Sequence, residues 1–265
     1  MKLILHLTHD CQLRCLYCYG GARRHGSMSW TVAKRALDML LEKPAGGGTQ
    51  PAEVCFFGGE PLLEWALLTQ CIPYAEGKAA ASGRPLELSI TTNGLALDED
   101  KADYLAGHGL NVVLSFDGVR EAQDASRRRN DGGSSFDATL RALRLLQERL
   151  EAPTVCAVVS PSNVRYLAAS VDLLLSEGVK RLMLNPDFFS EWRQEDLDLW
   201  RQGYEHAAMR FEQSYLDGMP VNVNLFTAKI ITHLKGGYDS SDCCLFGEGE
   251  IAVAPSGRNT PASEW

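Results

Sequence analysis

The chain has 265 residues, of which 45% are hydrophobic, and a formal net charge of −8. This length suits one α/β domain with a large core, and the acidic balance argues against broad nucleic-acid binding. No apolar run approaches the roughly 20 residues of a membrane-spanning helix, and the first segment resembles a strand rather than a targeting signal. We therefore expect a cytoplasmic protein.

Short apolar segments alternate with helical patterns along most of the chain. The predicted strands cover residues 3–7, 53–57, 86–91, 111–116, 154–160 and 181–184. The predicted helices lie near residues 30–42, 62–81, 98–107, 135–149 and 163–177. Six strand–helix units predict an α/β fold with a parallel sheet and helices outside it. The expected architecture is a partial (βα)6 TIM-like barrel, with ligands at the carboxyl ends of its strands.

The pattern changes after residue 186. Helical stretches are predicted at residues 194–216 and 227–234, and the segment 243–257 predicts a short strand pair that ends in a turn. We therefore predict a barrel over residues 1–186 and a C-terminal helical and hairpin appendage over residues 187–265.

Three closely spaced cysteines, Cys11, Cys15 and Cys18, follow the first predicted strand in a C-x3-C-x2-C pattern. A 4Fe–4S cluster takes four ligands, so three thiolates leave one iron open to a small molecule. Zinc prefers four protein ligands, and His9 or His25 keeps a mixed zinc site as an alternative. A disulfide framework fits poorly with 8 cysteines in a chain of this length. The pattern favours an iron–sulfur cluster.

Three further motifs follow predicted strands. Gly58-Gly59-Glu60 follows the second strand, Asn93 stands in Thr-Thr-Asn-Gly after the third, and Ser115 stands in Ser-Phe-Asp-Gly after the fourth. Glycines allow close approach of the backbone, and a carboxylate suits an ammonium partner. Asn-Gly and Asp-Gly are also common turn dipeptides, so ordinary turns remain the alternative reading.

Together with the cysteines, these motifs resemble the radical S-adenosylmethionine (radical SAM) superfamily over residues 3–185. The resemblance extends to its SPASM or twitch branch, which includes peptide-modifying maturases and anaerobic sulfatase-maturating enzymes. It implies a 4Fe–4S cluster on Cys11, Cys15 and Cys18, with S-adenosylmethionine at the open iron. Reductive cleavage of this cofactor gives a 5′-deoxyadenosyl radical that abstracts hydrogen from the substrate.

The same resemblance implies the partners of the protein. A peptide or protein substrate is expected, together with a flavodoxin- or ferredoxin-like electron donor, and neither a membrane nor a nucleic acid. Two alternatives remain open, namely a radical SAM enzyme acting on a small-molecule metabolite and a catalytically inactive, cluster-bearing peptide-binding protein. The pattern names no catalytic acid or base.

The resemblance also implies a set of cofactor contacts. Tyr17 would lie against the adenine, Glu60 and its glycines would meet the methionyl amino group, and Arg127 would pair with the cofactor carboxylate. Arg128 or Arg129 remain alternatives for this pairing. The implied cofactor-binding residues are Tyr17, Gly58, Gly59, Glu60, Asn93, Ser115 and Arg127. Gln123 stands where the family usually has histidine, so the role of that histidine does not transfer.

The C-terminal segment departs from the SPASM pattern. Cys244 and Gly257 have the expected spacing of twelve intervening residues, but Ala262 stands where a second cysteine is expected. The segment therefore lacks the ligands for a full auxiliary cluster. A natural short form, a piece of a longer chain, and an unrelated role of Cys243 and Cys244 are all open explanations.

Overall fold

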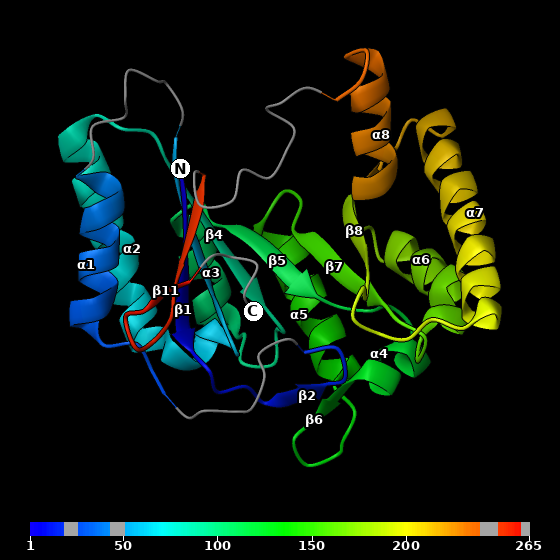
Figure 1. The fold of residues 1–265 in the computed structure, drawn as a ribbon, viewed down its shortest axis with the longest axis horizontal. Helices are drawn as coiled ribbons and strands as arrows, with labels where there is room; N and C mark the ends of the chain where they lie inside the picture. Colours follow the sequence, from blue (N-terminus) through cyan, green and yellow to red (C-terminus); the bar gives the residue numbers. More distant parts are fainter. Residues whose placement is uncertain (19–25, 43–50, 239–248, 261–265) are drawn as a thin grey trace.

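A nine-stranded sheet forms the centre of the molecule (Figure 1). The computed structural model describes residues 1–18, 26–42, 51–238 and 249–260. The strand order is β11-β10-β1-β3-β4-β5-β7-β8-β9, and every neighbouring pair is parallel except β10 and β11. This arrangement confirms the predicted α/β partial barrel.

The six predicted strands and five predicted helices are all present. The strands are β1 (Lys2–Thr8), β3 (Ala52–Gly58), β4 (Leu86–Thr92), β5 (Asn111–Ser115), β7 (Thr154–Val159) and β8 (Arg181–Pro186). The helices are α1 (Trp30–Leu41), α2 (Trp65–Ser82), α3 (Glu99–Gly107), α5 (Phe136–Arg149) and α6 (Leu167–Ser176). Short 3-10 turns, η1 (Pro61–Glu64) and η2 (Val164–Tyr166), precede α2 and α6.

Within residues 1–186, three short elements were not predicted from the sequence. They are α4 (Arg120–Ser126) and the strands β2 (Leu13–Cys15) and β6 (Arg127–Arg129), which pair with each other as a separate antiparallel ribbon. Strands of three residues carry too little hydrophobic alternation to be recognised. Their pairing depends on contacts between residues that are far apart in the sequence.

The segment after β8 begins with α7 (Gln194–Leu216), as predicted. It continues with the short strand β9 (Asn222–Val223), which was not predicted, and with α8 (Asn224–Leu234), which was predicted to begin three residues later. A strand pair follows, β10 (Glu250–Val253) and β11 (Asn259–Thr260), but β10 also pairs in parallel with β1. Strands β9 and β10 therefore extend the barrel sheet on its two sides. The division of the chain at residue 186 stays a prediction.

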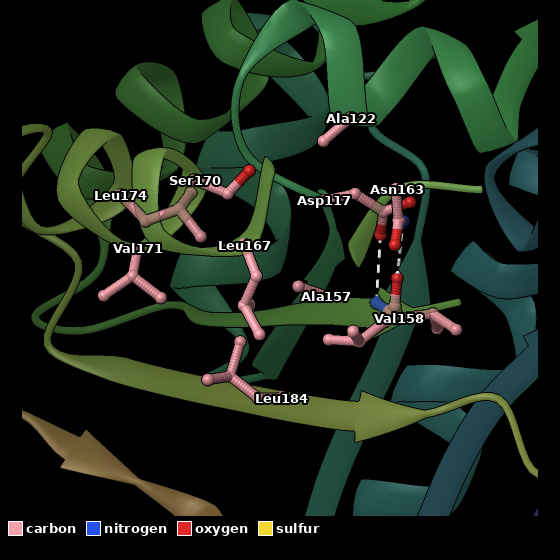
Figure 2. A pocket seen from close by; sticks show the side chains of 11 residues that line it. Asp117, Ala122, Ala157, Val158, Asn163, Leu167, Ser170, Val171, Leu174 and Leu184 are labelled. Carbon is pink, nitrogen blue, oxygen red and sulfur yellow. Dashed lines mark hydrogen bonds between the residues drawn. The ribbon is translucent and has the colours of Figure 1, made fainter. Parts of the chain in front are cut away.

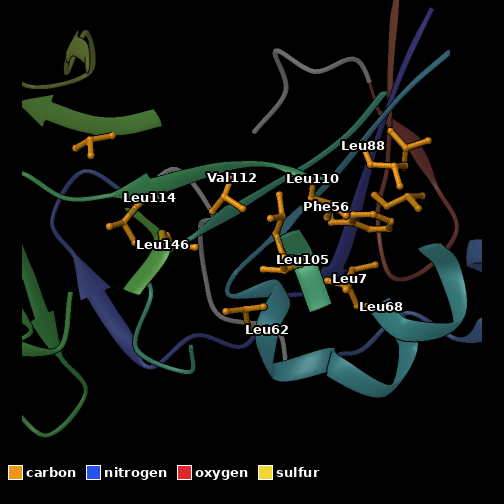
Figure 3. Close-up of a cluster of buried hydrophobic side chains, with 14 of the residues drawn as sticks. Leu7, Phe56, Leu62, Leu68, Leu88, Leu105, Leu110, Val112, Leu114 and Leu146 are labelled. Atoms are coloured by element: carbon orange, nitrogen blue, oxygen red, sulfur yellow. The ribbon is translucent and has the colours of Figure 1, made fainter. Parts of the chain in front are cut away.

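The core lies between the sheet and the surrounding helices. Leu3, Leu5 and Leu7 alternate along β1 and are fully buried, as the period of two along a strand requires. Figure 3 shows Leu7 and Phe56 from β1 and β3 among leucines of the neighbouring elements. Each buried leucine contributes roughly 1.5–3 kcal/mol to stability. None of the helices in the described ranges is long and apolar enough to cross a membrane.

Candidate cofactor site

The predicted site residues gather at the carboxyl ends of four neighbouring strands. The cysteine loop follows β1, Glu60 follows β3, Asn93 follows β4, and Ser115 ends β5. The ribbon β2–β6 lies at this same end, at the bottom of Figure 1. The carboxyl edge of a parallel sheet is where such folds bind ligands.

The cysteine loop carries three free thiols. Cys11 and Cys15 are half-buried and Cys18 is exposed. Burial raises the pKa of the Cys15 thiol to about 11, although the nearby Arg127 charge acts in the opposite direction. An unligated thiol at this position is therefore protonated at neutral pH, and a bound metal would have to displace its proton.

A single zinc ion and an iron–sulfur cluster require different arrangements of the thiols. No three His, Cys, Asp or Glu side chains within the described ranges converge on one point where a metal ion would bind. Tetrahedral zinc needs its sulfur ligands about 2.3 Å from a single ion, whereas each cysteine of an iron–sulfur cluster can bind a different iron. The C-x3-C-x2-C pattern can supply one thiolate to each of three irons, as such a cluster requires. His25 of the alternative zinc site lies outside the described residues.

The β2–β6 ribbon braces the cysteine loop. Its register pairs Leu13 with Arg129, Arg14 with Arg128, and Cys15 with Arg127. At one end the Leu16 amide donates to the Ser126 carbonyl over 2.9 Å. At the other end the Asn130 side chain donates to the Cys11 carbonyl over 2.8 Å. The backbone amide of Asn130 donates to the Gln12 carbonyl over 2.9 Å. The backbone of residues 127–129 thus holds the cysteine loop in place.

Gly58 and Gly59 allow the end of β3 to pack against the chain that leads into Cys11. A Cβ on Gly58 would lie 2.4 Å from the Thr8 carbonyl oxygen, and one on Gly59 would lie 2.3 Å from that of Asp10. Gly58 also has φ of +132°, a conformation that side chains disfavour. The Gly59 amide donates to the Thr8 carbonyl over 2.7 Å. Glycine is therefore required at both positions by close packing.

Glu60 joins the ends of β3 and β4. Its carboxylate is 1% exposed and accepts hydrogen bonds from the Thr92 hydroxyl (2.7 Å), the Asn93 amide (2.7 Å) and the Leu62 amide (3.0 Å). Burial raises its pKa to about 7, while these three bonds favour the charged form. All three donors belong to the protein itself, so the carboxylate holds the loops after β3 and β4 together.

Asn93 points toward the cysteine loop. Its side-chain amide donates to the Cys11 sulfur over 3.5 Å and to the Gln12 side chain over 3.3 Å. Its carbonyl oxygen accepts from the Leu95 amide over 2.9 Å, which fixes the orientation of the side chain. Hydrogen bonds to ligand sulfurs are one means by which proteins set the potential of a cluster.

Asp117 forms the centre of a buried polar group that includes Tyr17 and Arg127. Its carboxylate accepts from the Tyr17 hydroxyl, from Arg127 Nε over 3.0 Å and from the Val158 amide over 3.0 Å. Figure 2 shows Asp117 and Asn163 both bonded to the main chain of Val158. The cavity beside them measures about 10 Å³, room for one water at most and for no substrate.

The charges of this group are almost completely desolvated. The side chains of Arg127 and Asp117 are 8% and 1% exposed. The Arg127 guanidinium lies 5.1 Å from the centre of the Tyr17 ring, a cation–π contact. Burial alone would lower the pKa of Arg127, but the Asp117 carboxylate holds it well above its ordinary value. Burial also raises the pKa of Tyr17, so its hydroxyl stays protonated.

Sequence reasoning missed Asp117 and the role of Gln123. Gln123 is fully buried, accepts from the Asp117 amide over 2.9 Å and donates to the Ser135 hydroxyl over 2.9 Å. It therefore holds the backbone of Asp117. The available signal was an acid directly after an apolar strand, in a motif from which we selected Ser115 and for which an ordinary Asp-Gly turn remained the alternative.

The structure thus forms two hydrogen-bonded groups from the predicted site residues. Glu60 and Asn93 form one with Cys11, and Tyr17 and Arg127 form the other around Asp117. Ser115 is half-buried at the end of β5 and joins neither group in the part of the chain that the structure describes. Cys243, Cys244 and Ala262 lie outside the described residues.

The family of the chain follows from its sequence. The family model of the Radical SAM superfamily matches residues 5–174, more than half of the chain. The chain belongs to the radical SAM superfamily, whose members bind a 4Fe–4S cluster and S-adenosylmethionine.

Several curated proteins are similar over most of this chain. Fe-coproporphyrin III synthase of Methanosarcina barkeri is 29% identical over 89% of this chain and 57% of its own length. The cyclopropyl synthase TigE of Paramaledivibacter caminithermalis is 23% identical over 77% of this chain and 47% of its own. A cysteine-type anaerobic sulfatase-maturating enzyme of Clostridium perfringens is 23% identical over 92% of this chain and 68% of its own. The chain spans about half to two thirds of the length of these relatives.

Solved structures show the same fold. Native anSMEcpe with bound AdoMet superposes with a TM-score of 0.85 at 20% identity, over 100% of this chain and 74% of that protein. SuiB of Streptococcus suis bound to its precursor peptide SuiA superposes with a TM-score of 0.71 at 16% identity, over 99% of this chain and 59% of SuiB.

Proposed function

We propose that this protein cleaves S-adenosylmethionine reductively and abstracts a hydrogen atom from a peptide or protein, as in the maturation of ribosomally made peptides. The observation that carries the proposal is the cysteine loop, which is braced by the β2–β6 ribbon on one side and packed against Gly58 and Gly59 on the other. The likeness to SuiB, solved with a precursor peptide, and to sulfatase-maturating enzymes supports a peptide substrate.

We assign the cluster to Cys11, Cys15 and Cys18, with S-adenosylmethionine at the remaining iron. When both are bound and the cluster is reduced, they supply a 5′-deoxyadenosyl radical. Asn93 donates a hydrogen bond to the Cys11 sulfur and so favours its thiolate.

We assign the remaining cofactor contacts to Tyr17, Gly58, Gly59, Glu60, Ser115 and Arg127. Because Asp117 fixes both Tyr17 and Arg127, these two side chains are preorganised before the cofactor arrives. Glu60 keeps the loops after β3 and β4 together through its three hydrogen bonds. We place the catalytic barrel in residues 1–186 and a helical extension with a truncated or degenerate SPASM-like segment in residues 187–265.

Anaerobic reconstitution with iron and sulfide tests the cluster. We expect about four irons per chain and formation of 5′-deoxyadenosine after addition of dithionite and S-adenosylmethionine. Cys15→Ala should lose both, while Cys71→Ala, which changes a fully buried cysteine in α2, should keep both. Stoichiometric zinc without iron uptake would contradict the proposal. A full cluster without cleavage would favour the inactive, peptide-binding alternative.

A small-molecule substrate is the second candidate. It is favoured by the 29% identity to Fe-coproporphyrin III synthase, compared with 23% to the sulfatase-maturating enzyme. Deuterated substrates separate the two candidates, because hydrogen abstraction transfers deuterium into 5′-deoxyadenosine. Transfer from deuterated peptides supports the first proposal, and transfer from a deuterated iron porphyrin but from no peptide supports the second.

A further inference from the structure

The outer face of the β2–β6 ribbon carries two exposed arginines. Arg14 and Arg128 are directly opposite each other in the register of the ribbon, and both are exposed. Side chains alternate between the two faces of a strand, so this pair lies on the face opposite to Cys15 and Arg127. Leu16 follows at the end of the strand and is 72% exposed. The result is a basic surface with an apolar residue beside it.

The positive charge on this face is not neutralised within the described residues. Like charges directly opposite each other destabilise a strand pair. Arg128 Nε donates to the backbone carbonyl of Asp124 over 2.8 Å, and neither Arg14 nor Arg128 forms an ion pair with a residue that the structure describes. Arg129 does have an acidic neighbour, Asp131, at 3.6 Å. The chain as a whole has a net charge of −8, but Arg14 and Arg128 give this face a local positive charge that attracts an acidic partner.

The position of this face suggests what that partner does. The strand that carries Arg14 also carries Cys15, and the residue after β6, Asn130, is bonded to the Cys11 carbonyl. The basic face is thus the outside of the loop that we assign to the cluster. A protein bound here lies close to the cluster, whereas a substrate has to reach the inside of the barrel mouth.

We propose that the outer face of the β2–β6 ribbon is the docking surface for a small acidic electron-carrier protein with a flavin or iron–sulfur centre. One electron leaves the reduced carrier and enters the cluster on Cys11, Cys15 and Cys18, and no bond is formed or broken in this step. This inference rests on the proposed function. Steering by charge with a small contact area suits a partner that must bind and leave quickly.

Charge reversal of the ribbon tests the proposal. We compare Arg14→Glu/Arg128→Glu with Lys180→Glu/Arg181→Glu, which makes the same change in net charge at two exposed residues by the amino end of β8. The probe is an acidic flavodoxin, whose oxidised form is titrated by calorimetry into the reconstituted protein at low and high salt. We expect at least about tenfold weaker binding for the ribbon variant and less than about twofold for the control, with salt weakening wild-type binding.

Reduction of the cluster provides a second readout. Reduced flavodoxin should reduce the cluster of the ribbon variant at least about tenfold more slowly than that of the control variant. With excess dithionite, both variants should form as much 5′-deoxyadenosine as the wild type. If the wild type forms none, the proposed function fails, while the flavodoxin titration still decides the docking proposal.

Three outcomes would overturn the docking proposal. Equal weakening by the two variants would show an effect of net charge alone. Loss of dithionite-driven cleavage in the ribbon variant would show that the arginines maintain the loop itself. A raised KM for a peptide, with flavodoxin binding unchanged, would make this face a substrate surface.

The single variant Arg14→Glu separates docking from a structural role. It places opposite charges across the ribbon and should raise the melting temperature while it weakens flavodoxin binding. A lower melting temperature together with weaker binding would instead indicate damage to the ribbon and would count against the proposal.

Discussion

The buried carboxylate of Asp117 fixes the positions of other side chains in the candidate site. It bonds two of the predicted cofactor-binding residues, Tyr17 and Arg127, and is itself held by Gln123. Removing the two charges of such an ion pair from water costs free energy. In return, the pair fixes the positions of the Arg127 and Tyr17 side chains.

Removing the Asp117 carboxylate should therefore be severe. Asp117→Ala leaves the Arg127 guanidinium buried without its partner, and we expect the free energy of unfolding to fall by about 3–5 kcal/mol. Asp137→Ala, which breaks the exposed pair with Arg120, should change stability little. Denaturant unfolding measures both, and similar effects of the two variants would argue against the role of Asp117.

His6 gives the protein a defined response to acid. It is 5% exposed on β1, and burial, together with the charge of His9, lowers its pKa from 6.5 to about 4. The unfolded chain binds a proton below pH 6.5 that the folded chain does not bind until about pH 4. Titration of His6 therefore leaves the free energy of unfolding unchanged above pH 6.5. It lowers this free energy by up to about 3 kcal/mol as the pH falls from 6.5 to 4.

The variant His6→Leu removes this titration. Its unfolding free energy should decrease less steeply between pH 6.5 and 4 than that of the wild type, as measured by denaturant unfolding across this range. Identical slopes for the two proteins would show that His6 does not contribute.

At the scale of elements, the site depends on close contact between the end of β3 and the chain after β1. Gly58→Ala would place a methyl group 2.4 Å from the Thr8 carbonyl oxygen and force a shift just before Cys11. We expect a loss of about 2–3 kcal/mol in stability and reduced iron content after reconstitution.

Gly83→Ala is the matched control for this substitution. Gly83 also has a positive φ, of +65°, but a methyl group there would meet no atom within 4 Å. It should lose about 1 kcal/mol and keep its iron. If both variants bound iron equally well, the contact between Gly58 and Thr8 would not matter for the cluster loop.

The elements differ in how far the sequence determines them locally. Strands such as β3 and helices such as α5 follow from apolar periodicity, because each buries one continuous face. The ribbon β2–β6 does not follow from it, since its strands are three residues long and separated by more than one hundred positions. Residues 127–129 therefore suggested only a partner for the cofactor carboxylate, Arg127 with Arg128 or Arg129 as alternatives, and gave no hint that their backbone braces the cysteines.

At the scale of the whole molecule, the sheet includes strands from both ends of the chain. Ala252 on β10 is fully buried, between β1 and β11. Ala252→Pro removes an amide from this part of the sheet and should detach β10. We expect faster hydrogen exchange of the β1 amides, while Ala252→Gly, which keeps the amide, should leave them protected. Unchanged exchange in the proline variant would show that β10 does not shield β1.

The fold as a whole was more predictable than the site. Motifs at strand ends indicated which loops meet, because parallel strands bring their carboxyl ends together. The motifs did not indicate which side chains form hydrogen bonds where these loops meet, such as Glu60 with Thr92 or Asn93 with the Cys11 sulfur. Such partners depend on side-chain orientation and burial, which spacing along the chain does not encode.

The pairing of β1 with β10 has a consequence for synthesis. Lys2 and Glu250, which face each other in this pair, are 248 positions apart. At about 5–20 residues per second, the ribosome needs roughly 10 to 50 seconds to complete the interval. Throughout that time one side of β1 has no strand to pair with and can join another nascent chain. The risk of aggregation through this side of β1 therefore lasts until β10 emerges, and chaperones that bind the nascent chain should raise the yield of folded protein.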